Sequence, residues 1–371
     1  MGGNWNMSLY KIKIKVASPL QISDIVIGNV LKQSGTFCLQ SSTVRGGILS
    51  KIYREQGVKE VIEESKDTSI NFHPAYPVDN GIISRPPHIL LHKCKICEGG
   101  VFINKVLQNK ELLKEFNFER FDIPYKCSEG HLFAISPVKS LVIFKDSKYK
   151  EINIKKMQLE SIGMNRALSQ TELGMIYSYI TIRPGVIFDG LIYDPKDKIE
   201  KLLGYKPKNE YIRVGRGISR GMGITEFEFE EVNYEKYIEK RASEIKDAIL
   251  KTEGIVILRA LTPILSMDKA EFSYKIDLSE YGLQPMEVFN GVNYLTQSPE
   301  ILKGYSVYTN LPKIEVKGLG SGTLYFYKIE NKIKIDEISM LLSEFEIKGF
   351  AHPFNVGLNI MEVYTDVGKL L

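Results

Sequence analysis

The segment 211–223 of this chain, YIRVGRGISRGMG, places four glycines and three arginines in one short stretch. Closely spaced glycines indicate a backbone that takes positive φ angles or packs tightly against another group. The interleaved arginines indicate that this group is anionic, because a guanidinium matches phosphate oxygens with two parallel hydrogen bonds. The segment therefore predicts a loop that cradles a nucleic-acid backbone.

Two nucleotide-binding alternatives do not fit this segment. It lacks the Gly-Lys-Ser/Thr ending of a Walker A motif, and it does not join a strand to a helix as a dinucleotide-binding fingerprint does. Residues 224–230, ITEFEFE, alternate apolar and polar side chains, which is typical of a strand. The glycine-rich loop is therefore expected to lead into a strand.

The composition favours two or three domains and no general affinity for polyanions. The 371 residues are 43% hydrophobic and 25% charged, with a net charge of +4, so a nucleic-acid surface must be a local stripe. No apolar run approaches the ~18 residues of a membrane span, and the first residues lack a signal-peptide pattern. Four cysteines do not make a disulfide scaffold. We therefore expect a cytoplasmic protein with no membrane partner.

The first half of the chain has the element order of a ferredoxin-like βαββαβ unit. Residues 10–16, YKIKIKV, alternate strictly, which predicts a strand with its lysines outward. Serine and threonine at 41–43 offer an N-cap for the helix that follows. The expected elements are a strand at 10–16, a helix at 41–53, a hairpin of strands 176–182 and 186–193, a helix at 197–203 and a strand at 224–230.

The second half repeats this start in a degenerate form. Residues 234–250 predict an amphipathic helix, and residues 255–261 predict a strand that runs into Thr-Pro as the first strand runs into Ser-Pro. Further strands are expected at 324–328 and 358–364. The predicted fold is α+β with two ferredoxin-like domains: 1–232, which holds an insertion at 84–138 and the loop 211–223; a connecting helix at 233–253; and 254–371.

The insertion contains a metal-ligand pattern. Cys94 and Cys97 form a C-x2-C pair, and Cys127 and His131 follow after a long gap as C-x3-H. Three thiolates and one imidazole are a ligand set for a structural Zn²⁺ ion in tetrahedral coordination. Four protein ligands leave no open position for a catalytic water. The alternatives are unrelated side chains or a disulfide, and the nearby His88 and His92 could replace a ligand.

Three segments resemble the RAMP superfamily of CRISPR-associated proteins. Residues 41–53, SSTVRGGILSKIY, are similar to its first-helix motif; residues 163–190 are similar to its central region; and 211–223 looks like its glycine-rich loop. Together with the cysteine-containing insertion, they resemble the Csx-ten family, a Cas-five-like subunit of type III-D effector complexes. The resemblance covers roughly the first 230 residues. Residues 349–357 lie where a second glycine-rich loop is expected, without its usual arginines.

The resemblance implies a place in a multisubunit, RNA-guided complex of antiviral defence. Such a subunit binds the 5′ repeat-derived tag of the crRNA. It bridges the large polymerase-like subunit to the Cas-seven-like backbone subunits and meets target RNA indirectly. The RNA-binding residues that we expect from the motifs are Arg45, Gly46, Gly47, Lys51, Arg166, Arg213, Gly215, Arg216, Gly217, Arg220 and Gly221.

Several aromatic and basic residues have both a functional and a structural interpretation. Tyr177, Tyr179 and Tyr211 could stack on unpaired bases, but Tyr177 and Tyr179 fit better as packing residues on a sheet. The lysines at 11, 13 and 15 could face RNA, although a solvated strand face is the simpler interpretation.

The main hypothesis is a binding subunit without chemistry of its own, since no catalytic constellation is visible. One alternative is a backbone subunit that cleaves target RNA with Asp24, in the loop after the first strand. A second is an endoribonuclease that processes guide RNA, with His73 or His352 as general base. A third is a zinc-ribbon adaptor that binds only protein. Salt dependence of RNA binding separates the adaptor from the others.

Overall fold

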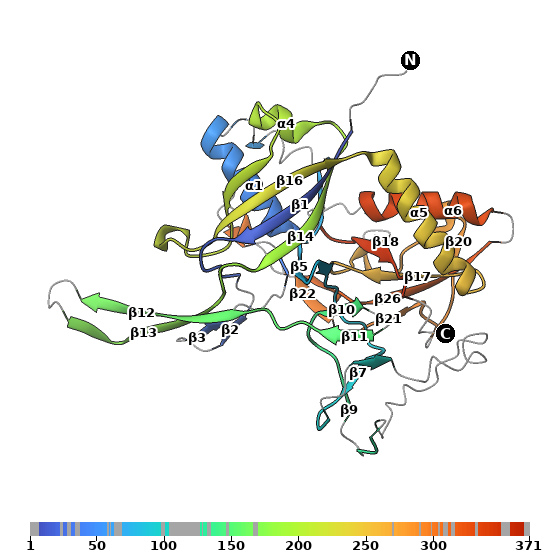
Figure 1. Cartoon of the computed structure of the whole chain (residues 1–371), viewed down its shortest axis with the longest axis horizontal. Coiled ribbons are helices and arrows are strands. Elements are labelled where there is room, and N and C mark those ends of the chain that lie inside the picture. Colours follow the sequence, from blue (N-terminus) through green and yellow to red (C-terminus); the bar gives the residue numbers. More distant parts are fainter. Residues whose placement is uncertain are drawn as a thin grey trace. The chain divides into compact units, whose positions relative to one another are not determined.

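A computed structural model describes residues 7–22, 25–27, 31–33, 38–57, 59, 61–62, 69–97, 101–103, 127, 129–131, 135–145, 148–165, 170–268, 271–288, 291–297, 299–302, 305–306, 311–312, 316–330, 333–349 and 357–366. The chain is mixed α/β, and most of its strand pairs are antiparallel (Figure 1). It divides into two units: Met1–Ile83 with Asn153–Val232, and Ser84–Ile152 with Asn233–Leu371. Among the described residues, no helix combines the length and apolar character needed to cross a membrane.

The first unit is built on a seven-stranded antiparallel sheet with β1 inside it. β1 shows the predicted alternation: Tyr10, Ile12, Ile14 and Val16 are buried, and the lysines between them are exposed. The strand order is β15 (Asn209–Arg213), β16 (Ile224–Val232), β1 (Ser8–Val16), β14 (Ile187–Asp194), β5 (Tyr76–Asp79) and β6 (Ile82–Ile83), and β4 (Asn71–Phe72) also pairs with β14.

Two helices cover one face of this sheet. α1 (Ser41–Gln56) and α4 (Lys198–Leu203) contribute buried aliphatic side chains to one core with the inward residues of β1, β14 and β16. The expected hydroxyl cap is not used, because the N-cap of α1 is Gln40, without a side-chain hydrogen bond. The opposite face of the sheet carries the lysines of β1.

The predicted hairpin of residues 176–182 and 186–193 is wrong. Both strands exist, but β13 (Gln170–Ile182) belongs to a separate sheet, in the order β12 (Lys156–Asn165), β13, β3 (Leu31–Gln33) and β2 (Ile25–Ile27). β13 pairs along its length with β12, so β14 takes β5 as its neighbour instead.

The second unit has its own antiparallel sheet. Its order is β20 (Leu283–Pro285), β26 (Leu324–Ile329), β17 (Ile255–Ala260) and β27 (Met361–Val363), and β21 (Tyr294–Leu295) also pairs with β26. α5 (Tyr234–Lys251) and α6 (Ile335–Lys348) pack against one face, where Ile245, Ile249, Ile338 and Leu342 share a core with β17 and β26.

Residues 84–152 belong to this second unit. Leu90, Leu91, Val142 and Tyr149 share a core cluster with Ile257, Leu324 and Phe326 of the second sheet. The observed division thus differs from the expected one, in which 84–138 was an insertion of the first domain and 233–253 a connector. The reason is that β17 and β26 are apolar on both faces, so their sheet needs a second cover.

The remaining elements are short. They are β7 (Leu91–Cys94), β8 (Phe102–Ile103), β9 (Ile135–Pro137), β10 (Val142–Lys145), β11 (Lys148–Glu151), β18 (Ser266–Asp268), β19 (Glu271–Ser273), β22 (Pro299–Leu302), β23 (Tyr305–Ser306), β24 (Leu311–Pro312), β25 (Val316–Leu319) and the 3₁₀ turns Ile218–Arg220 and Ser279–Tyr281.

Candidate nucleic-acid interface and metal centre

The glycine-rich segment forms a closed loop between β15 and β16. Its neck is fixed by a hydrogen bond of 2.8 Å from the amide of Val214 to the carbonyl of Gly223. The segment that follows β1 also contacts the loop. The amide of Arg216 donates to the carbonyl of Gln21 at 2.9 Å, and the amide of Gly223 donates to the carbonyl of Pro19 at 2.9 Å. The loop is therefore held by backbone contacts on two sides.

Two glycines are required for this closure. Gly215 and Gly223 have φ angles of +81° and +76°. A Cβ atom would lie 2.4 Å from the carbonyl oxygen of Gln21 at Gly215, and 2.0 Å from that of Val214 at Gly223. Gly221 differs, because no atom of the described residues lies within 4 Å of its added Cβ. The backbone at Gly221 is thus open to an incoming group, whereas Gly215 and Gly223 serve the fold.

The three arginines of the loop have different surroundings. Arg213 and Arg216 are exposed, and neither forms an ion pair within the described part of the chain. Arg220 instead donates from Nη1 to the hydroxyl of Tyr179 at 2.7 Å, with its guanidinium carbon 5.4 Å from the ring centroid. Arg220 therefore ties the loop to β13, and Arg213 and Arg216 remain for a ligand.

The first turns of α1 lie beside this loop. A Cβ atom on Gly47 would lie 2.5 Å from Cγ1 of Val214 and 3.0 Å from Cγ2 of Ile212, so α1 packs closely against β15. Gly46 is exposed, and no described atom lies within 4 Å of its added Cβ; Arg45 is half-buried. The structure thus brings two separate sequence motifs together.

Lys51 does not join this cationic surface. Its ammonium contacts Glu55 at 2.5 Å and Glu210 at 2.9 Å. Burial alone would lower the pKa of Lys51, but hydrogen bonds to these two glutamates raise it above its ordinary value. The charge of Lys51 is therefore compensated within the protein, and we leave this residue out of the proposed RNA surface.

Several other predicted residues lie elsewhere. Asp24, Arg166 and His352 are outside the part of the chain whose side chains the structure describes. His73 is 7% exposed, which suits a packing role. Tyr179 is also buried, as the packing interpretation expects. Sequence reasoning missed Gln21, because its role depends on a backbone carbonyl that no side-chain pattern reveals.

The exposed face of the first sheet carries a ladder of paired charges. The register places Lys11, Lys13 and Lys15 of β1 opposite Glu230, Glu228 and Glu226 of β16. Two of these pairs are in contact, Lys13–Glu228 at 3.8 Å and Lys15–Glu226 at 3.2 Å. The lysines are thus compensated on a solvated face, and they do not form a phosphate-binding stripe.

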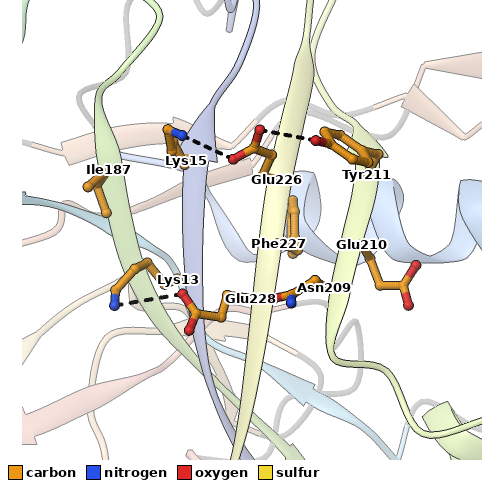
Figure 2. Close-up of a pocket in the computed structure, with 9 residues that line it drawn as sticks. All are labelled: Lys13, Lys15, Ile187, Asn209, Glu210, Tyr211, Glu226, Phe227 and Glu228. Atoms are coloured by element: carbon orange, nitrogen blue, oxygen red, sulfur yellow. Dashed lines mark hydrogen bonds and ion pairs between the residues drawn. The ribbon is translucent and has the colours of Figure 1, made fainter.

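A pocket of about 310 Å³ opens on this face beside β15 (Figure 2). Its walls include both contacting Lys–Glu pairs and the ring of Tyr211, which is 68% exposed. The Tyr211 hydroxyl donates to Oε1 of Glu226 at 3.3 Å. Figure 2 shows the Tyr211 hydroxyl directed toward Glu226, while Glu210 points away.

The predicted metal ligands come together in the second unit. Cys94 ends β7, Cys127 and His131 precede β9, and the ligand atoms of these three and Cys97 all lie within 4.8 Å of one another. The Sγ atoms of Cys94 and Cys127 are 3.7 and 3.4 Å from Nδ1 of His131, and the Sγ atoms of Cys97 and Cys127 are 4.0 Å apart. Bonds of ~2.3 Å to sulfur and ~2.0 Å to nitrogen make tetrahedron edges of roughly these lengths.

The chemistry of the cluster also suits a metal. The four cysteines, all of which lie among the described residues, form no disulfide, so the disulfide alternative is wrong. Backbone amides of Cys97 and Ile96 lower the pKa of the Cys94 thiol to about 6, which favours the thiolate that binds metal. His88 and His92 are not ligands here, because His88 lies 3.2 Å from the Tyr364 hydroxyl and His92 lies 3.2 Å from the Leu90 carbonyl.

The sequence matches no known family and no curated protein. Among solved structures, the chain is similar to one in the type III-B Cmr-beta complex bound to cognate target RNA and AMPPnP, with 14% identity, 95% of this chain and 99% of that chain covered, and a TM-score of 0.48. A second Cmr-beta structure with cognate target RNA gives 14% identity, coverages of 88% and 94%, and a TM-score of 0.46. Cmr4 (Cas7) of Pyrococcus furiosus gives 13% identity, coverages of 60% and 100%, and a TM-score of 0.27.

Proposed function

We propose that this chain is an RNA-binding structural subunit of a type III, III-D-like, CRISPR complex, and a RAMP protein of the Csx-ten kind. In this role it binds the 5′ repeat-derived tag of the crRNA. It bridges the large polymerase-like subunit to the Cas-seven-like backbone subunits, and it meets target RNA indirectly. The three sequence motifs at 41–53, 163–190 and 211–223 support the family.

One observation carries the RNA-binding proposal: the closed loop presents Arg213 and Arg216 without ion-pair partners in the described chain, next to the open backbone of Gly221. An exposed guanidinium with no carboxylate beside it is available to phosphate oxygens. The exposed Gly46, the sixth residue of α1, lies on the neighbouring element. These groups fit a ribose-phosphate chain better than base edges.

The sheet topologies support two ferredoxin-like RAMP domains. In the first unit the order β16, β1, β14, β5 places the last strand beside the first, and α1 and α4 follow the first and third strands. That arrangement is the split βαβ pattern. The second unit has the same order with β27, β17, β26 and β20, although its second covering helix, α5, precedes the first strand.

We further propose that Cys94, Cys97, Cys127 and His131 hold a structural Zn²⁺ ion. Three sulfur atoms and one imidazole nitrogen at tetrahedral spacing are the donors that zinc prefers. When bound, the ion joins the end of β7 to the segment before β9. With all four positions filled by protein, its role is to stabilise this part of the chain.

Removal of the two exposed arginines, Arg213 and Arg216, tests the RNA-binding role. We expect the Arg213→Ala/Arg216→Ala variant to bind single-stranded RNA more weakly. Its log Kd against log salt should flatten by about 1.4, since each phosphate contact contributes ~0.7 on a single strand. Fluorescence anisotropy over a KCl series measures both quantities. The control, Lys145→Ala/Lys148→Ala, removes two exposed charges from the second unit. An unchanged slope in the arginine variant would contradict the proposal.

Purification of the tagged chain from its host tests the assembly role. We expect small RNAs with repeat-derived 5′ ends, together with a large polymerase-like subunit and Cas-seven-like subunits. Sequencing of the bound RNA and mass spectrometry of the proteins identify them. Recovery of the chain alone, free of RNA, would overturn this role.

A further inference from the structure

Tyr211 has an unusual position for a tyrosine. It lies on β15, an edge strand of the first sheet among the described residues, and its side chain is 68% exposed. Because strand residues alternate between faces, Tyr211 shares the solvent-facing side of β15 with Asn209 and Arg213, and all three are exposed. Ile212, between them, is buried toward α1. An aromatic ring and an exposed cation, which forms no ion pair with any described residue, thus lie on the same face of this edge strand.

The Tyr211 ring is restrained by a carboxylate on the neighbouring strand β16. The Tyr211 hydroxyl donates to Oε1 of Glu226 at 3.3 Å, and Nζ of Lys15 donates to Oε2 of the same carboxylate at 3.2 Å (Figure 2). Both oxygens of Glu226 therefore have partners, which restrains the carboxylate and, through it, the ring. An exposed aromatic ring that is already oriented loses little conformational entropy when a ligand stacks on it.

The pocket beside the ring discriminates between kinds of ligand. Its walls hold Lys13 and Lys15 against Glu228 and Glu226, and the third lining carboxylate, Glu210, is paired with Lys51, so no lining cation is left without a carboxylate. A phosphate there would lie among three carboxylates, and both lining lysines already have carboxylate partners. The volume of about 310 Å³ is at the lower end of the ~300–1,000 Å³ typical of ligand sites. A small, flat, uncharged group with polar edges fits this site.

We propose that this pocket receives one unpaired nucleobase of the RNA strand, stacked on Tyr211, with its polar edge toward Asn209 and Glu226. The inference rests on the proposed function, and it adds a base-binding subsite to the phosphate contacts. Arg213 lies two residues along β15 on the same face, ~6.7 Å away along the strand. The backbone next to the stacked base is then within reach of the exposed Arg213 guanidinium.

Comparison of intact and abasic RNA tests this subsite in the full-length chain. The probes are a single-stranded oligoadenylate and a ribose-phosphate oligomer of equal length without bases. The wild type should prefer oligoadenylate. Tyr211→Ala should reduce affinity for oligoadenylate about 5- to 100-fold, as loss of one base–aromatic stack does, and leave affinity for the abasic oligomer unchanged. Tyr211→Leu, which keeps bulk without a π-face, should behave like Tyr211→Ala.

Two control variants separate stacking from other effects. Tyr211→Phe keeps the ring and loses only the hydrogen bond to Glu226, so it should stay within about threefold of the wild type. Tyr53→Ala removes another exposed tyrosine, on α1 and outside the pocket lining, and should have no effect. Loss of affinity for both probes in Tyr211→Ala would overturn the inference, because it would indicate a general effect on the loop.

The salt series distinguishes failure of this inference from failure of the proposed function. Tyr211→Ala should leave the slope of log Kd against log salt unchanged, whereas Arg213→Ala/Arg216→Ala flattens it. If the arginine variant behaves as expected and Tyr211→Ala binds oligoadenylate like the wild type, the subsite alone is refuted. The same holds if Tyr211→Ala weakens assembly with protein subunits but not RNA binding. If the wild type binds neither probe, both proposals fail.

Discussion

The two main sheets share a strand order and differ in what covers their second face. In each, helices pack on one side: α1 and α4 in the first unit, α5 and α6 in the second. The other face of the first sheet is a solvated ladder of lysines and glutamates. The other face of the second sheet is covered by residues 84–152, through Leu90, Leu91, Val142 and Tyr149. One topology therefore supports an open surface in one unit and a closed core in the other.

The central strands already carry this difference. β1 alternates lysine with aliphatic residues, and its lysines are exposed. β17 reads IVILRA, and five of its six residues are buried. A strand with one solvated face needs alternation, whereas a strand covered on both faces is mostly apolar. The open face in the first unit leaves room for the pocket beside Tyr211.

Glutamate pairs with a basic side chain in both units, but the pairs differ in their exposure to solvent. In the second, Glu362 accepts from Nε of Arg85 at 2.8 Å and from Nε of Arg259 at 2.9 Å, and Arg259 and Glu362 are buried. In the first, Lys13 and Glu228 are more than half exposed. Breaking a buried pair leaves a charge without compensation, whereas an exposed pair is replaced by water. The second unit should therefore depend far more on its charges.

If the proposed zinc ion is bound, its removal should give the largest difference between the units. β7 carries Leu91 in the second core and Cys94 in the metal cluster, so loss of the ion should loosen the cover of the second sheet. Structural zinc contributes about 10–16 kcal/mol in small peptides, as much as a typical domain's stability of ~5–15 kcal/mol. With a zinc chelator, hydrogen exchange should accelerate in β7, β9 and β17 but not in β1 or β16.

A cysteine outside the cluster provides the control for metal removal. Cys97→Ser should reproduce the effect of the chelator, whereas Cys38→Ser should retain the metal and the slow exchange of the wild type. Equal acceleration in β1 and β17 would contradict the assignment of residues 84–152 to the second unit.

Substitution of Glu362 should give the next largest effect. Glu362→Gln leaves the guanidiniums of Arg85 and Arg259 without their shared carboxylate, and we expect a loss of about 3–5 kcal/mol in the free energy of unfolding of the second unit. Glu228→Gln, which breaks the exposed pair with Lys13, should cost ~1 kcal/mol or less. Urea denaturation followed by circular dichroism and hydrogen exchange measures both; equal costs would refute the comparison.

The buried pair should also make the second unit sensitive to acid. Burial alone would raise the pKa of Glu362, but Arg85, Arg259 and Arg241 lower it to about 2. Because the unfolded carboxyl has a pKa of ~4.3, the unfolded chain takes up the proton first as pH falls. The stabilisation is therefore complete above pH ~4.3, and about 3 kcal/mol is lost as the pH falls toward 2. Glu362→Gln should lack this part of the pH dependence.

Alanine in the glycine-rich loop should give a smaller effect, confined to the first unit. Gly223→Ala places a Cβ 2.0 Å from the carbonyl oxygen of Val214, at a φ of +76°, so the neck must open; we expect a cost of about 1–3 kcal/mol and weaker RNA binding. Gly221→Ala has the same backbone penalty without a clash, at ~1 kcal/mol. Urea midpoints and RNA anisotropy compare them, and identical behaviour would exclude the neck as the cause.

Local patterns predicted much of the fold. The alternation at 10–16, the amphipathic helix at 234–250 and the apolar strand at 255–261 correspond to β1, α5 and β17. Pairing between distant segments was not predictable in the same way. The strand at 176–182 pairs with β12 and not with β14, because the residue pattern of one strand does not specify its neighbour. The attachment of residues 84–152 depends on which sheet has an uncovered apolar face.

The candidate sites show the same limit. The spacing of the cysteines and the histidine predicted a cluster that could hold a metal ion, and the structure brings these four side chains together. The loop with Arg213 and Arg216 was predicted from the glycines and arginines of residues 211–223. The pairing of Lys51 with Glu210, however, joins α1 to β15 across a long sequence separation. The orientation of Tyr211 likewise depends on Glu226 on the next strand, which only the register reveals.

The path of the chain between the units constrains how the protein is made. The chain changes unit after residues 83, 152 and 232, so the ribosome delivers residues 84–152 well before β17 and β26. Leu90, Leu91 and Val142 are therefore synthesised before the sheet that they cover. Until that sheet forms, their apolar side chains are exposed and can bind chaperones or misassemble. In a chain truncated after residue 232, these side chains would never be covered. A stable fragment of the first unit must therefore also omit residues 84–152.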